Sequence, residues 1–181
     1  MTIFFTIIII LLVICLLLMW YIFTYNKFQE LTIKTNEVEA GIDTTLRKRF
    51  DLLNKSINII KANTPVEGEI LELIVKLRSR KLSNFELDRQ LYDAINEFNC
   101  YKEKYPSLMD IDSFSKINSS LNQSENEIIA LRKYYNDIIT EYDTLVKKFP
   151  SNLVAKISKY KEKNYYDGKN MYDDITNDFK L

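Results

Sequence analysis

The chain has 181 residues, and its 25 Lys and Arg balance 25 Asp and Glu, which argues against a nucleic-acid-binding protein with a basic stripe. It contains no histidine, so Ser-His-Asp triads, Cys-His pairs and histidine zinc sites are excluded. Its 3 Gly and 3 Pro are too few for a phosphate-binding loop and predict long regular segments.

Residues 3–23 form an apolar run that no Lys, Arg, Asp or Glu interrupts. About 20 residues at roughly 1.5 Å each cross a hydrocarbon core of roughly 30 Å. A helix is expected, because the backbone in lipid must satisfy its own hydrogen bonds. The sequence therefore predicts a transmembrane anchor over residues 1–24, with the bilayer contacting residues 3–23.

The sequence around this run favours an uncleaved anchor over a secretory signal. No basic residue precedes the run and no small-residue cleavage site follows it. Trp20 and Tyr21 suit a membrane–water interface. Lipidation at Cys15 is disfavoured, because the residue before it, Ile14, is not small. Since Lys27 is among the first basic residues beyond the run, we expect a single-pass protein of the cell membrane, with its amino terminus outside and its body in the cytoplasm.

A long amphipathic helix is predicted to continue from the anchor to Asn63, because no proline separates the two. A restart is expected at residues 64–67, where Thr64 and Glu67 can form a capping box around Pro65. Apolar residues of the first helix recur three, four or seven positions apart, which predicts one buried stripe. Its members are Phe28, Leu31, Val38, Ile42, Leu46, Phe50, Leu53, Ile57 and Ile60.

Two further helices are predicted downstream. Ser83 and Glu86 form a second capping box, and the helix that follows ends before Pro106. The next helix carries a bundle-type seam with one polar position, Ser124 or Glu125, and Ser151 is expected to cap a short final helix. The seam comprises Phe114, Ile117, Leu121, Ile128, Leu131, Tyr135, Ile138, Tyr142, Leu145 and Phe149.

Helical legs of similar length predict an all-α fold: a transmembrane helix followed by an elongated antiparallel helical bundle of three to four long helices over residues 25–158. Cys100 is expected to be a small core residue. Residues 159–181 are rich in tyrosine but lack periodicity. For this tail, disorder, packing of its tyrosines on the bundle and binding of a partner all remain open.

The chain resembles the LemA family of bacterial membrane proteins from Tyr25 to about Ala155. The resemblance implies an N-terminal transmembrane helix, a cytoplasmic four-helix-type bundle and no established enzymatic activity. The sequence departs from the family pattern at Asn54-Lys55 and at Val66. The matching stretches are Tyr25-Asn26, Leu46-x-x-Arg49-x-Asp51-Leu52, Tyr105-Pro106-x-Leu108, Glu125-Asn126-x-Ile128, Arg132-x-Tyr134-Tyr135-Asn136 and Phe149-Pro150-x-Asn152-Leu153-x-Ala155.

Five polar residues within these stretches should face one another across helices: Arg49, Asp51, Glu125, Arg132 and Asn136. They are either a recognition site for a partner or a network of ion pairs and amides that fixes helix register. We favour the register network.

No catalytic, cofactor-binding or metal-binding residue is predicted. The leading hypothesis is a membrane-anchored, non-enzymatic scaffold that interacts with an unidentified protein, and homo-oligomerisation is left open. The alternative is a membrane-linked stress or signal-transducing module. An enzyme that uses carboxylates and tyrosines is disfavoured, because no such residues stand out by their spacing.

Overall fold

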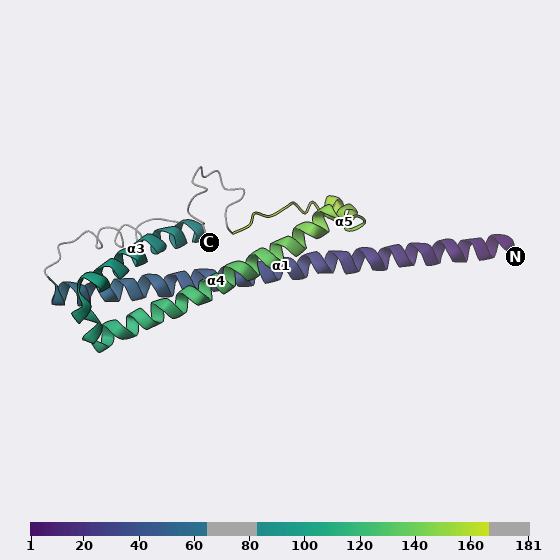
Figure 1. The fold of residues 1–181 in the computed structure, drawn as a ribbon. Helices are drawn as coiled ribbons and strands as arrows, with labels where there is room; N and C mark the ends of the chain where they lie inside the picture. Colours follow the sequence, from purple (N-terminus) through teal and green to yellow (C-terminus); the bar gives the residue numbers. More distant parts are fainter. Residues whose placement is uncertain (65–82, 167–181) are drawn as a thin grey trace. The chain divides into compact units, whose positions relative to one another are not determined.

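The computed structural model describes residues 1–64 and 83–166, and all its regular elements there are helical (Figure 1). In chain order these are α1 (Thr2–Asn63), α3 (Asn84–Lys104), the 3-10 helix η1 (Pro106–Asp110), α4 (Asp112–Lys147) and α5 (Ser151–Ile157). The predicted all-α fold is confirmed. The restart predicted at Thr64–Glu67 lies mostly outside the described residues.

The chain divides into two compact units. The first, here called the anchor unit, combines residues 1–37 with the chain from residue 134 onward. The second, here called the network unit, is residues 38–133. The first part of α1 and the second part of α4 belong to the anchor unit, and the remainders of both helices belong to the network unit.

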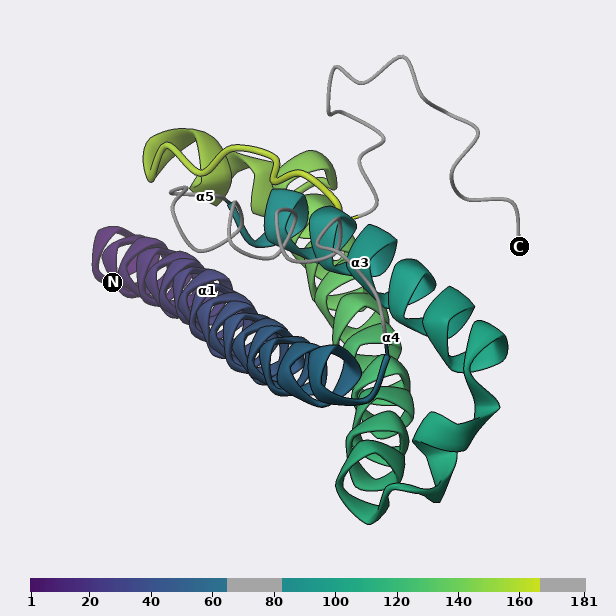
Figure 2. The same ribbon diagram turned by 90° about the vertical axis from the view of Figure 1, so that its left-hand side faces the viewer.

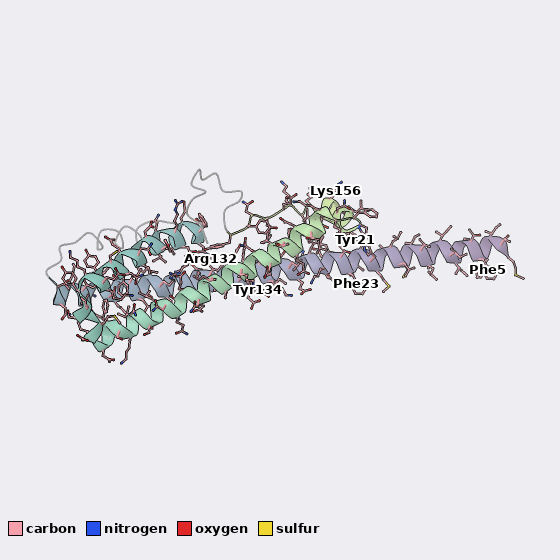
Figure 3. The ribbon with its side chains drawn as sticks, viewed as in Figure 1. Phe5, Tyr21, Phe23, Arg132, Tyr134 and Lys156 are labelled. Atoms are coloured by element: carbon pink, nitrogen blue, oxygen red, sulfur yellow. The ribbon has the colours of Figure 1, made fainter. Side chains whose placement is uncertain are left out.

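Helix α1 is continuous from the apolar run to Asn63, as the absence of proline predicts. By length and composition it is long and apolar enough to cross a membrane. Every side chain from Ile3 to Met19 is exposed, and Phe5 projects from a part of α1 that no other helix covers (Figure 3). Within residues 1–64 and 83–166, the predicted anchor therefore has the least internal packing.

Figure 2 shows α1, α3 and α4 of the network unit, and all three helices contribute buried apolar side chains to its core. Phe98 of α3 stacks on Phe114 of α4, with ring centroids 5.0 Å apart. Gly41 faces α4, since a Cβ there would lie 3.4 Å from the Leu131 side chain, at ordinary contact distance. The core residues are Val38, Ile42, Leu46, Leu53, Ile57, Ile60, Leu91, Ala94, Phe98, Leu108, Phe114, Ile117, Leu121 and Ile128.

The anchor unit has a smaller core, in which the second part of α4 packs on α1. Lys27 of α1 pairs with Glu141 of α4 at 2.9 Å. Helix α5 contributes the buried apolar side chains of Val154 and Ala155. The core residues are Phe28, Leu31, Ile138, Ile139, Tyr142, Val154 and Ala155.

Helix ends follow the local sequence closely. The Ser83–Glu86 capping box is confirmed, with both reciprocal hydrogen bonds present. These bonds satisfy backbone N–H groups that have no partner within the helix. Helix α3 ends at Lys104, before Pro106, as predicted.

Three predictions about single residues are wrong. Phe149 does not extend the seam, because α4 ends at Lys147 and the Phe149 side chain is 74% exposed. Ser151 is the first residue of α5 and makes no cap. Its hydroxyl donates instead to the carbonyls of Leu145 and Lys148 at the end of α4. Cys100 is exposed, because it lies two residues beyond Phe98 and therefore on the opposite side of α3.

Candidate functional site

The network unit buries an arginine within its apolar core. Arg49 is 1% exposed and lies between Leu46 and Leu53 on α1. The spacing of three and four that buries these two leucines also buries Arg49. An unpaired guanidinium there would lose several kcal/mol of hydration free energy, so its partners decide whether this core is stable.

Those partners come from two other helices. Arg49 forms an ion pair with Glu125 of α4 and lies 3.9 Å from Asp88 of α3. Asp88 is 4% exposed and also pairs with Arg132 of α4. We call Arg49, Asp88, Glu125 and Arg132 the arginine network. Two positive and two negative charges sum to zero, and the ion pairs link α1, α3 and α4.

Three of the five predicted site residues, Arg49, Glu125 and Arg132, meet in this network; Figure 3 labels Arg132 on α4. Asp51 is exposed on α1 and takes no part in it, because it lies two residues beyond Arg49 and so on another face of the helix. Asn136 belongs to the anchor unit, where its side-chain oxygen accepts a 2.8 Å hydrogen bond from the backbone N–H of Tyr166.

Sequence reasoning missed Asp88. It precedes Leu91 by three residues, on the same face of α3 as Leu91 and Ala94. An acidic residue on an apolar stripe is a signal that a basic partner is buried nearby, since an isolated carboxylate would be too costly to bury.

The polar seam position involves two residues. Ser124 is fully buried and donates to the carbonyl of Leu121 in its own helix. Glu125 is half-buried and reaches Arg49. Glu125 is therefore the residue that links helices, whereas the Ser124 hydroxyl makes its hydrogen bond within α4.

The chemistry of the arginine network is suited to holding helices together. Its carboxylates are held by guanidinium groups, which fix the positions of helices relative to one another within the unit. Among residues 1–64 and 83–166, no group of three or more Cys, Asp or Glu side chains is placed to hold a metal ion.

The anchor unit contains a different cluster, built from aromatic rings. Phe28 is fully buried, stacks on Tyr160 at 4.5 Å and meets Tyr142 edge-on at 5.5 Å. Gln29 donates a 2.7 Å hydrogen bond to the Tyr160 hydroxyl. Burial raises the pKa of both Tyr142 and Tyr160. We call Phe28, Tyr142 and Tyr160 the aromatic junction.

A backbone turn brings Tyr160 to this junction. Lys159 has a φ of 58°, in the left-handed region. The N–H of Tyr160 donates to the carbonyl of Ala155 at 2.9 Å, and that of Lys159 donates to Lys156 at 3.3 Å. This is a Schellman motif, which ends α5 and turns the chain. The first residues of the tyrosine-rich tail thereby return to α1.

The next residues of the tail pack on α4, one of the three outcomes left open for this segment. The backbone N–H of Lys163 donates to buried Asp143 at 3.0 Å. Lys147 pairs with Glu162 at 2.8 Å, and the hydrogen bond to this carboxylate raises the pKa of Lys147. The tail prediction beyond residue 166 lies outside the described residues.

Comparison with known proteins identifies the family. A sequence model of the LemA family matches residues 38–179, most of the chain. The chain belongs to the LemA family. The match contains the whole arginine network, begins after the apolar run and extends beyond Ala155, where the expected resemblance ended.

A curated relative agrees with this LemA assignment. The chain is 26% identical to Protein LemA of Metamycoplasma hominis over 149 residues, covering 76% of this chain and 68% of the relative. It is also 27% identical to Magnetosome proteins MamQ 1 and MamQ 2 of Paramagnetospirillum magneticum over 77 residues. That alignment covers 42% of this chain and 28% of each magnetosome protein.

Proposed function

We propose that this LemA-family protein is a membrane-anchored, non-enzymatic helical scaffold that binds another protein. The observation that carries the proposal is the continuity of α1. One uninterrupted helix supplies the exposed apolar run and the buried stripes of both units. Insertion of the run into a bilayer would remove its apolar side chains from water and hold the folded units at the membrane.

The residues at and just beyond the end of the run fit a membrane boundary. Trp20 and Tyr21 are suited to the interface, and Lys27 is the first charged residue that follows. A hydrogen bond from Lys27 to Glu141 raises the pKa of the lysine and keeps it charged. A charged, paired lysine favours water over hydrocarbon, so the span should end before it. Lys27 and Lys34 favour a cytoplasmic location for the units.

Carbonate extraction of membranes that contain the full chain tests the anchor. We expect the wild-type protein to stay in the membrane pellet. Leu12→Lys should weaken its retention, because lysine at the centre of a span costs about 2.5–3.5 kcal/mol. Ile33→Lys is the matched control, since Ile33 is an exposed apolar residue of the same helix outside the run. Wild-type protein found entirely in the supernatant would reject the anchor.

Site-specific photo-crosslinking tests the scaffold. In the network unit, Tyr92 of α3 is 56% exposed and Ile129 of α4 is 52% exposed. A photoreactive group at an exposed position can reach a protein that docks on that face. A photoreactive residue at either position should give reproducible adducts with a membrane or cytoplasmic protein in cells. Adducts between copies of the chain would identify a homo-oligomer, and no adducts at either position would contradict a scaffold.

The continuity of α1 also favours the second candidate, a stress or signal-transducing module. A rigid helix can transmit a displacement of the span to the buried stripes. Three glycines inserted at Tyr25–Lys27 should interrupt this coupling while leaving the protein in the membrane. An unchanged stress phenotype in cells that carry the insertion would reject the signalling role and leave the scaffold intact.

A further inference from the structure

Helix α5 carries an apolar face that the described residues do not cover. Phe149, Leu153 and Ile157 are 74%, 46% and 68% exposed. Leu153 and Ile157 are four residues apart and therefore share one side of α5, and Phe149 is exposed in the turn just before the helix. The other side of α5 is buried through Ser151, Val154 and Ala155.

Contacts within the anchor unit place α5 at the end of the apolar run. The Tyr21 hydroxyl lies 3.3 Å from the Ser158 hydroxyl, and the ring of Tyr25 lies 6.2 Å from that of Tyr160. In Figure 3 the labels of Tyr21 and Lys156 mark adjacent parts of the unit. Since Tyr21 precedes the end of the run at Phe23 by less than one helical turn, α5 lies at the level where the span would leave the hydrocarbon.

Positive charge is concentrated around the same helix. Residues 147–163 contain six lysines and one glutamate, although the whole chain is formally neutral. Two of these lysines are engaged within the unit: Lys147 pairs with Glu162, and Lys163 lies over the ring of Tyr142. The remaining four are exposed: Lys148, Lys156, Lys159 and Lys161.

We propose that α5 is a second membrane-contact element, which lies in the headgroup layer of an anionic leaflet. Phe149, Leu153 and Ile157 enter the boundary between headgroups and acyl chains, and the four exposed lysines bind anionic headgroups. An apolar face bordered by lysines is the pattern of an interfacial helix. The inference rests on the proposed anchor, because the apolar run is what brings α5 to the bilayer. That position favours lipid over a second protein as the occupant.

Spin labels on the full-length chain in lipid nanodiscs test this inference. In a Cys15→Ser, Cys100→Ser background, single labels are placed at Leu153→Cys, at Ile129→Cys and at Leu12→Cys. The collision rate of each label with oxygen is divided by its collision rate with a polar nickel complex. A high oxygen-to-nickel ratio reports that the label is immersed in lipid. In nanodiscs that contain phosphatidylglycerol, we expect a higher oxygen-to-nickel ratio at position 153 than at position 129, with position 12 the highest.

The three labels separate the two proposals. A lipid-immersed position 12 with position 153 as accessible to nickel as position 129 would overturn the role of α5 and leave the anchor standing. A water-accessible position 12 would overturn both. Shielding of position 153 that depends on the number of chains per disc, and not on the lipid, would show that a second copy covers α5 and would also overturn the inference.

A charge variant tests the headgroup contact. Lys156→Gln, Lys159→Gln and Lys161→Gln together remove exposed positive charge and leave the apolar face unchanged. We expect the oxygen-to-nickel ratio at position 153 to lose its dependence on phosphatidylglycerol. The matched control is Lys55→Gln with Lys61→Gln, two exposed lysines on the part of α1 that belongs to the network unit. An equal loss in the control would contradict a specific role for the lysines of α5.

Discussion

The two units bury different side chains between the same pair of helices. In the network unit, α1 and α4 enclose Arg49 and its ionic partners within an aliphatic core. In the anchor unit, the same two helices enclose the rings of Phe28 and Tyr142, which Tyr160 completes. Most charged contacts of the anchor unit, such as Lys27 with Glu141, are exposed.

This difference matters because the two kinds of contact tolerate change unequally. A buried ion pair depends on all its partners, since removal of one leaves a charge without compensation. An aromatic cluster loses stability gradually, roughly in proportion to the contact area removed. The network unit should therefore be specific in its helix register, and the anchor unit should be more tolerant of repacking.

The largest expected effect is at Arg49. Arg49→Ala should lower the free energy of unfolding by roughly 3–5 kcal/mol, because it leaves a cavity and removes a partner from buried Asp88 and from Glu125. Urea unfolding of the full chain in detergent micelles measures this. Arg47→Ala removes an exposed guanidinium paired with Asp43 on the same helix and should have little effect. Equal effects of the two variants would show that the network does not stabilise the core.

A smaller effect is expected at Phe28. Phe28→Leu keeps most of the apolar volume but removes the ring contacts to Tyr142 and Tyr160, so the free energy of unfolding should fall by about 1–2 kcal/mol. The same urea experiment applies, with Ile33→Ala as a control on an exposed position of the same helix. A loss as large as that of Arg49→Ala would contradict the contrast between the two units.

Gly41 offers a stabilising change in the network unit. A Cβ at this position would lie 3.4 Å from Leu131, an ordinary contact with the end of a flexible side chain. Gly41→Ala should therefore raise the free energy of unfolding by about 0.5–1 kcal/mol through its higher helix propensity. Gly41→Leu should lower it, because the larger side chain would force α4 away. Stabilisation by both would show that the helices are not closely packed there.

The smallest expected effect is a pH dependence at the start of α3. Hydrogen bonds from the backbone N–H and the hydroxyl of Ser83 lower the pKa of Glu86 below its ordinary value of 4.5. The stability this gives is present above the unfolded-state pKa and is lost as the pH falls through the lower folded-state pKa.

Urea midpoints at about pH 7 and about pH 4 measure this effect, since the second value lies below the unfolded-state pKa. Glu86→Gln should reduce the difference between the two midpoints. Ser83→Ala should reduce it less, because the backbone N–H, which makes the larger contribution, remains. If the two urea midpoints of Glu86→Gln differed by as much as those of the wild type, the Glu86 carboxylate would not contribute to the pH dependence of stability.

Residue spacing was sufficient to predict much of the fold. The end of α1 at Asn63, the capping box at Ser83 and the buried stripe from Phe28 to Ile60 all follow from local propensity and helical periodicity. Of the candidate site, the sequence identified Arg49, Glu125 and Arg132. It included Asp51 and Asn136, which the structure places elsewhere, and it omitted Asp88. Periodicity reports which side of a helix a residue occupies, but it does not report which helix that side meets.

The sequence by itself determined the helices, their buried faces and the exposed apolar run, because these depend on contacts within a few residues along the chain. Only the tertiary structure decided that Asp88 is the carboxylate shared by two arginines, that Tyr160 returns to Phe28, and that α5 lies beside Tyr21. Each of these contacts joins residues far apart in the sequence. Whether they form depends on how the helices pack and on where Lys159 turns the chain, which no local pattern encodes.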